Sequence, residues 1–146
     1  MNRLTRFVLL LLSSLPACGS AIDLPAPAPG SWQTTVQLYV NGQAKGAPRV
    51  SVACVDAVRY ASEKRDAAAY VAASCSKDST SRHGNQWITD RVCSLGKSTV
   101  TGHAVTVFAG ASAYHSQTDS QYAPALDGKR QTRMVVDAKR LGSCTR

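Results

Sequence analysis

Apolar and polar residues alternate with period two over most of the chain beyond about residue 30, which indicates strands with one buried face. In residues 32–40, Trp32 and four apolar or β-branched residues occupy every second position, and mostly polar residues lie between them. Asn41-Gly42 indicates a turn, and residues 49–55 repeat the alternation. Two antiparallel strands are therefore predicted at the start of the domain.

The period then changes to that of a helix. Asp56 is a suitable N-cap residue, and the helix is predicted to run to about Ala73. Alanines, Tyr60 and Val71 fall on one stripe, and charged residues including Glu63 lie opposite. We expect the apolar stripe to pack on the sheet.

Five further strands are predicted at residues 75–82, 86–94, 98–108, 112–122 and 129–141. The strand at 112–122 is unusually polar, so it should be an edge strand or line a wet groove. The whole pattern predicts an α+β domain. It consists of a curved antiparallel β-meander of about seven strands, with one helix inserted after the second strand.

The N-terminus has the order of a secretory signal peptide. Arg3 and Arg6 precede an apolar run at residues 7–15 that is too short to span a membrane, and small residues follow. Cleavage after Ala21 would leave a periplasmic or secreted protein. Residues 15–18 (Leu-Pro-Ala-Cys) instead resemble a lipobox, in which Cys18 would be lipidated and residues 1–17 removed as a lipoprotein signal. Pro16 is unusual in such a motif.

The chain after the signal peptide is predicted to consist of a short spacer and one domain. Residues 22–30 (IDLPAPAPG) form a Pro/Ala-rich spacer, which suits either a stalk or a loose N-terminus. Residues 31–146 should form a single domain, since 146 residues leave no room for a second. We expect a monomer.

Four cysteines remain beyond Cys18, an even number that favours two disulfides in an oxidising compartment. A three-residue loop at 83–85 would place Cys75 opposite Cys93 in a hairpin, and Cys54 would then pair with Cys144. A two-residue loop would shift this register. The spacings do not suggest a zinc site.

The formal net charge is +8, and several basic residues lie near the C-terminus. Such a run is most often a solvated strand face, but it could meet an anionic lipid or polymer. Nucleic acid is a poor partner for an exported protein with few aromatic residues near its basic ones. The run comprises Lys129, Arg130, Arg133, Lys139, Arg140 and Arg146.

Short motifs in a fixed order carry a family resemblance. They are Pro29-Gly30-Ser31-Trp32, Cys54-Val55, Cys75, the Gly84 to Trp87 turn, Cys93 and the closing Lys-Arg-Leu-Gly-Ser-Cys at 139–144. In these the chain resembles the small exported proteins of Gram-negative bacteria catalogued as domain of unknown function 3617. The resemblance implies an envelope location and a four-cysteine architecture, and contributes no catalytic residue.

Five of the residues that carry the resemblance are most simply explained by structural roles. They are Gly30, Trp32, Gly84, Trp87 and Gly142. Gly30 would let the chain bend as it enters the sheet, and Trp32 would anchor the core. Gly142 would free the backbone so that Cys144 can reach its partner.

Catalytic patterns are sparse, so we expect neither an enzyme nor a cofactor. The sequence has no Gly-x-Ser-x-Gly or HExxH motif and no phosphate-binding loop. A two-residue turn at 110–111 would place His103 opposite Thr118, so His103 and His115 would not be cross-strand partners. We therefore interpret the three histidines as surface residues that bind no metal. They are His83, His103 and His115. A catalytic site could be assembled from a serine, His115 and Asp119, but nothing in the sequence fixes the spacing between them.

Three functions remain open. The first is a non-catalytic envelope domain that binds a partner protein or an anionic or lipophilic ligand in the concave side of its sheet. The second is an inhibitor of a host or rival enzyme such as a lysozyme, acting through the loop at 122–129. The third, an enzyme, would require His115 and Asp119 buried together in a cleft.

Overall fold

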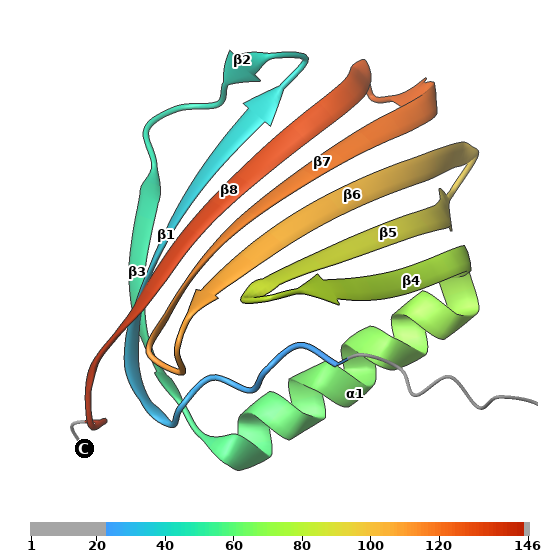
Figure 1. The fold of residues 1–146 in the computed structure, drawn as a ribbon. Coiled ribbons are helices and arrows are strands. Elements are labelled where there is room, and N and C mark those ends of the chain that lie inside the picture. The colour runs from blue at the N-terminus through green and yellow to red at the C-terminus, as the bar shows by residue number, and fades with distance from the viewer. Residues whose placement is uncertain (1–22, 145–146) are drawn as a thin grey trace, which may run out of the picture.

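A computed structural model describes residues 23–144, and the proposed signal segment, Cys18 and Arg146 lie outside them. These residues form a curled antiparallel sheet with one helix beneath it (Figure 1). The elements are β1 (Gly30–Val40), β2 (Gln43–Ala44), β3 (Arg49–Val55), α1 (Ala57–Ser74), β4 (Cys75–His83), β5 (Gln86–Leu95), β6 (Ser98–Ala109), β7 (Ala113–Leu126) and β8 (Lys129–Gly142). The α+β prediction is therefore confirmed, with a two-residue β2 as an additional strand.

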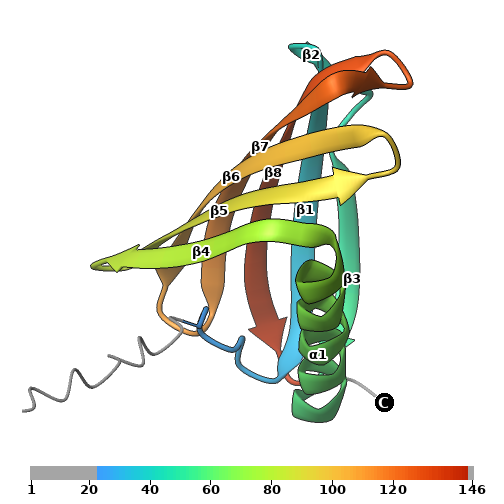
Figure 2. The ribbon, with the colours of Figure 1, turned by 90° about the vertical axis from the view of Figure 1, so that its right-hand side faces the viewer.

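The strand order is β2-β1-β8-β7-β6-β5-β4, and β3 pairs with β1 beside β2. Strands β4 to β8 form a meander, and β1 returns to pair with β8 along ten residues. The helix α1 leaves the edge strand β3 and leads into β4, the strand at the opposite edge (Figure 2). It therefore bridges the two ends of the curled sheet.

Alternation gives the sheet an inner face, on the side of α1, and an outer face. Trp32, Phe108 and Tyr114 are on the inner face, and the centroid of the Tyr114 ring lies 6.2 Å from that of Trp32 and 5.7 Å from that of Phe108. Trp87 extends this row onto β5, 5.0 Å from Phe108. Trp32, Trp87 and Ala138 are the buried hydrophobic residues of the described chain, so the core is small and lies at one end of the inner face.

The helix begins as predicted but does not pack as predicted. Asp56 caps it by accepting a hydrogen bond from the Arg59 backbone N–H (2.8 Å). No residue of α1 is buried, and Val58 is 81% exposed. The helix spans the gap between two sheet edges, its contacts with the sheet fall mainly on β4 and β5, and most of its alanine stripe remains exposed.

The described part of the predicted spacer contacts the folded domain. The Trp32 indole Nε1 donates to the Ala28 carbonyl (2.8 Å), and the Ala28 N–H donates to the Ala111 carbonyl (3.2 Å). Asp23 forms an ion pair with Lys64 of α1 (3.1 Å). The segment from Asp23 to Pro29 therefore covers the aromatic end of the inner face and contacts the helix.

The polar strand β7 is not an edge strand. It pairs with β6 along one side and β8 along the other, so its polar side chains line grooves on both faces. It also continues to Leu126, so the predicted loop at 122–129 is reduced to a turn at Asp127-Gly128. The Asn41 side chain holds this turn: its amide donates to the Gly128 carbonyl (3.0 Å), and its oxygen accepts from the backbone N–H groups of Arg130 (2.9 Å) and Gln131 (3.2 Å).

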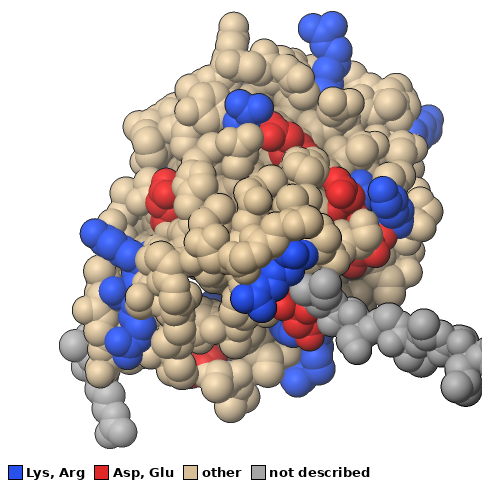
Figure 3. All heavy atoms as spheres, viewed as in Figure 1, with Lys and Arg blue, Asp and Glu red and all other residues tan. Residues whose placement is uncertain are grey.

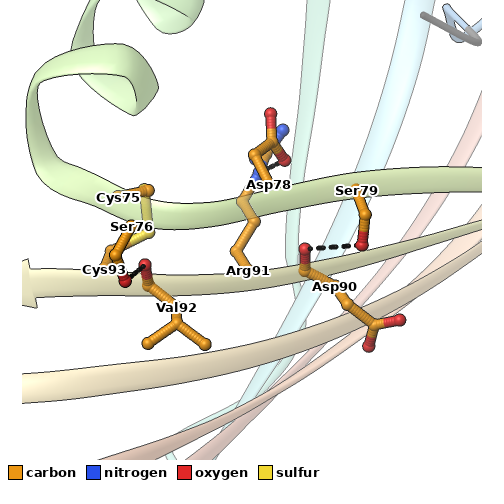
Figure 4. The surroundings of a disulfide bond; sticks show 8 residues. All are labelled: Cys75, Ser76, Asp78, Ser79, Asp90, Arg91, Val92 and Cys93. Atoms are coloured by element: carbon orange, nitrogen blue, oxygen red, sulfur yellow. Dashed lines mark hydrogen bonds and ion pairs between the residues drawn. A yellow bond between two sulfur atoms is a disulfide. The ribbon is translucent and has the colours of Figure 1, made fainter. Parts of the chain in front are cut away.

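Both disulfides pair as predicted, Cys54 with Cys144 and Cys75 with Cys93. The register argument behind the second pair was nevertheless wrong. The β4–β5 turn has two residues, Gly84 and Asn85, which shifts the ladder by one position. An irregularity between Cys75 and Lys77 shifts it back, and Cys75 again faces Cys93 (Figure 4). The bulge leaves Ser76 outside the pairing, as expected for an extra residue in one strand.

Candidate functional site

The end of the inner face away from the aromatic row is open and apolar. Leu38 on β1 and Met134 on β8 face each other there, and they remain 39% and 40% exposed. The groove has a volume of about 690 Å³, within the range typical of small-molecule sites. We call it the inner groove, and it is lined by Leu38, Val40, Asn41, Lys45, Thr118, Ser120, Tyr122, Asp127, Gly128, Lys129, Thr132 and Met134.

The floor of the inner groove comes from three adjacent strands. Val40 pairs with Thr132 on β8, which pairs with Ser120 on β7, and the next inner-face row joins Leu38, Met134 and Thr118. The Tyr122 hydroxyl lies 3.3 Å from the Thr132 hydroxyl. Small hydroxyl side chains on β7 leave room above the apolar groups of β1 and β8, which gives the sheet a hollow.

Charged groups lie where turns end the inner groove. Lys45 follows β2, and Asp127 and Lys129 belong to the β7–β8 turn held by Asn41. Lys129 is half-buried, and a lysine in this setting can lay its methylene stem on apolar surface while its ammonium group stays in water. Two basic residues and one acidic residue thus border the open end.

The outer face carries a row of charged residues at matched positions. Asp90, His103, Asp119 and Arg133 are successive cross-strand partners from β5 to β8. His103 Nδ1 lies 2.8 Å from an Asp90 carboxylate oxygen, and Arg133 Nε donates to Asp119 (2.6 Å). We call these four residues the outer row.

Electrostatics within the outer row follow from these contacts. The hydrogen bond with His103 lowers the pKa of Asp90. Partial desolvation raises the pKa of Asp119, but hydrogen bonds from Arg133 and Gln117 and the charge of Arg133 outweigh it, so the pKa is lowered overall. Both shifts favour the ionised carboxylates, which suits ion pairing on the surface of the sheet.

The histidines do not assemble with the residues considered from sequence. The β6–β7 turn has three residues rather than two, so His103 faces Asp119 and not Thr118. His115 instead bonds Asp137 on β8 (2.7 Å) and is half exposed. His103 and His115 are not cross-strand partners, as predicted. His115 and Asp119 thus belong to separate side-chain pairs, with Asp137 and Arg133 respectively.

The basic run near the C-terminus is divided between the faces of β8. Arg133 and Lys139 are on the outer face, whereas Lys129 lines the inner groove, and Arg140 Nε donates to the Pro29 carbonyl (2.9 Å). Acidic side chains are interspersed with the Lys and Arg side chains in the view of Figure 3. The run therefore does not form one basic patch.

Two findings concern the described residues 23–144 alone. They include no cluster of three or more His, Cys, Asp or Glu residues arranged to hold a metal ion. Among the same residues, no helix is long and apolar enough to cross a bilayer.

Sequence reasoning predicted a binding site on the concave side of the sheet, but not the position or the lining residues of the inner groove. Alternation placed Leu38 on the face of Trp32 and Met134 on the apolar face of the last strand, which was correct. Nothing in the local pattern indicated that β1 pairs with β8, or that α1 covers only the other end. The pairing of distant strands was the missing information.

The fold and the two disulfides define a class: an α+β domain with an open curled sheet fastened covalently at both ends. Disulfides of this kind persist in oxidising compartments and indicate an exported protein. The family model described as protein of unknown function (DUF3617) matches residues 27–144, and the chain belongs to this family. No curated protein and no solved structure matches the chain.

Proposed function

We propose that this protein is a non-catalytic binding domain of the bacterial cell envelope that holds a lipophilic or anionic ligand, or a partner protein, against its inner face. The observation that carries the proposal is the uncovered apolar end of that face, where Leu38 and Met134 stay about 40% exposed. Apolar side chains on a concave surface left open to solvent mark ligand or partner sites.

The histidine geometry does not support the catalytic site considered from the sequence. His103 and His115 are each engaged by one exposed carboxylate, Asp90 or Asp137. A nucleophile or general base needs a positioned partner within hydrogen-bond reach of a bound substrate. The candidate Ser-His-Asp arrangement of His115 with Asp119 lacks that proximity, because each carries a different partner.

The inhibitor alternative has less support. Inhibition by insertion requires a projecting loop, whereas Tyr122 and Ala123 of the proposed segment pair with β6, and Leu126 pairs with Lys129 at its other end. Its turn consists of Asp127 and Gly128, and the Asn41 side chain ties that turn to the β1–β2 turn. So short and fixed a turn offers little to insert into an enzyme cleft.

The proposed location is the periplasm or the periplasmic side of the outer membrane of a Gram-negative bacterium. Intact mass spectrometry of the protein purified from its native envelope tests this. A chain that begins at Cys18 and carries acyl chains would establish a tethered lipoprotein, and one that begins at Ile22 would establish a soluble exported protein. An unprocessed Met1 chain with free thiols would contradict export.

The binding proposal is tested with a neutral solvatochromic dye, Nile red, and the oxidised protein. Met134→Gln changes the inner groove at an exposed position and keeps the side-chain volume, so the fold should survive. We expect the dye to bind the native protein at least fivefold more tightly than this variant. Val50→Gln is the matched control, since Val50 is 62% exposed on the outer face of β3. Equal binding by all three proteins would contradict the proposal.

A further inference from the structure

The inner groove combines an apolar floor with cations at one end, and this combination specifies a ligand more narrowly than the proposed function does. We propose that the groove binds one long-chain fatty acid, with the alkyl chain on the floor and the carboxylate beside Lys45 and Lys129. This inference rests on the proposed function and names the chemical class of its ligand.

The floor suits an unbranched alkyl chain. Leu38, Val40 and Met134 supply a continuous apolar strip across β1 and β8, and Tyr122 borders it from β7. Methionine side chains are flexible and adapt to chains of different length. The strip continues along the strands through Val36 and Val136, which are cross-strand partners, toward the aromatic row. A chain can therefore lie parallel to the strands.

The far end of the strip limits the length of the ligand. Tyr114 is half-buried between Trp32 and Phe108, and the segment before β1 covers Trp32. Burial raises the pKa of the Tyr114 hydroxyl, and the nearby Tyr60 of α1 adds to the effect. The helix and the N-terminal segment thus close this end, so a chain enters from the end bearing the lysines.

The open end suits an anionic head group. Lys45 and Lys129 contribute two ammonium groups, and Asp127 is the acidic residue among those lining the groove, so the local balance is positive. Asn41 fixes the turn that carries Lys129 through its three hydrogen bonds to residues 128–131. Because the backbone that carries Lys129 is held before binding, only the side chain has to be ordered when its ammonium group pairs with a carboxylate.

Calorimetric titration of the delipidated, oxidised protein with dodecanoate tests the proposal, below the micelle-forming concentration of the ligand. Affinity should rise about fourfold for each CH2 added from decanoate upward until the strip is filled, because each buried CH2 stabilises by about 0.8 kcal/mol. Dodecanol has the same alkyl chain but no carboxylate, so its affinity measures the contact with the groove floor alone.

Two variants separate the head-group contact from general charge. Lys45→Gln with Lys129→Gln should weaken dodecanoate binding at least tenfold and leave dodecanol binding within twofold. Lys97→Gln with Lys139→Gln removes the same charge from positions outside the groove and should change neither. Equal weakening of dodecanoate by both double variants would overturn the lysine contact and the proposal with it.

The remaining outcomes are also decisive. Dodecyl phosphate binding tenfold more tightly than dodecanoate would overturn the fatty acid in favour of a phosphate head group. Failure of dodecanoate to bind, while Nile red still distinguishes Met134→Gln from Val50→Gln, would refute the fatty acid and leave the binding function intact. Failure of both ligands would refute both proposals.

Discussion

The start of β1 lies against the end of β8, and Gly30 makes that approach possible. Its φ is +145°, a backbone conformation that side-chain-bearing residues rarely adopt. A Cβ at this position would collide with the Gly142 carbonyl oxygen and lie 2.7 Å from Arg140 Nε. Trp32, two residues later, is buried and anchors the aromatic row. One residue type therefore determines how the two strands meet beside the core.

Replacing Gly30 with alanine should destabilise the domain by about 2 kcal/mol or more, because backbone strain and the collision with β8 add together. The free energy of unfolding, from urea denaturation of the oxidised protein, measures this. Gly102→Ala is the control, since its Cβ would meet its nearest atom, the Ser120 hydroxyl oxygen, at 3.9 Å. The control should shift stability by less than about 0.5 kcal/mol. Equal losses would contradict the close approach.

At the scale of elements, α1 differs from the strands in how it is held. It has no buried residue, so packing, which supplies most of the stability of helices in proteins, contributes little here. Each of its ends adjoins a disulfide instead: Cys54 precedes its N-cap, and Cys75 follows its last residue. The helix is thus a bridge fixed at both ends and exposed between them.

Amide hydrogen exchange should therefore find α1 much less protected than β6, β7 and β8, because few buried contacts oppose its local opening. Asp56→Ala removes the N-cap and should cost the helix about 1 kcal/mol, which increases exchange in its first turns about fivefold. Asp66→Ala, at an exposed position within the helix, is the control and should not accelerate exchange. Protection of α1 equal to that of β7 would show that it packs more firmly than its exposure indicates.

The outer row should make stability dependent on pH in the acid range. Because the folded state lowers the pKa of Asp90 and of Asp119, the ionised forms contribute stability above the unfolded-state value of about 3.9. That contribution is lost as the pH falls through the lower folded-state values. Asp119→Asn should therefore make the loss of stability below about pH 4 less steep. The midpoints of urea unfolding, determined from pH 2 to pH 6, measure this loss. Asp66→Asn on α1 is the control, and an unchanged slope in Asp119→Asn would contradict the assignment.

At the scale of the whole molecule, the curled sheet is an open structure fastened at its two edges. Cys54–Cys144 joins β3 to the residues that follow β8, and Cys75–Cys93 joins β4 to β5. Because the core is small, these covalent links take on part of the stabilisation that a larger core would supply. The same small core leaves the apolar end of the inner face uncovered.

Removing the two disulfides separately should have unequal effects. Loop-closure entropy predicts a loss of about 4.5 kcal/mol for Cys54→Ser with Cys144→Ser, which spans 90 residues, against about 3 kcal/mol for Cys75→Ser with Cys93→Ser, which spans 18. Urea unfolding of the two double variants measures the difference. A larger loss from the shorter link would show that local bulge geometry outweighs chain entropy.

Local sequence signals predicted the elements well and the registers poorly. Period two identified the strands, and Asp56 marked the start of the helix. The predicted turn lengths at Gly84 and Gly110 were each wrong by one residue. An error of one residue in a turn shifts the register, so each residue of the hairpin faces a different cross-strand partner. That error hid the Asp119–His103 pairing, whereas the Cys75–Cys93 pairing survived because the bulge at Ser76 restored the register.

The sequence alone determined the alternating strands, the capped helix, the even set of cysteines and the family, because these depend on neighbouring residues and on the order of short motifs. The tertiary structure decided that β1 pairs with β8, that α1 spans the sheet without packing on it, and that the inner groove stays open. These features depend on contacts between residues far apart in the chain. Alternation determines which face a side chain occupies, but only the assembled sheet determines which part of that face is covered.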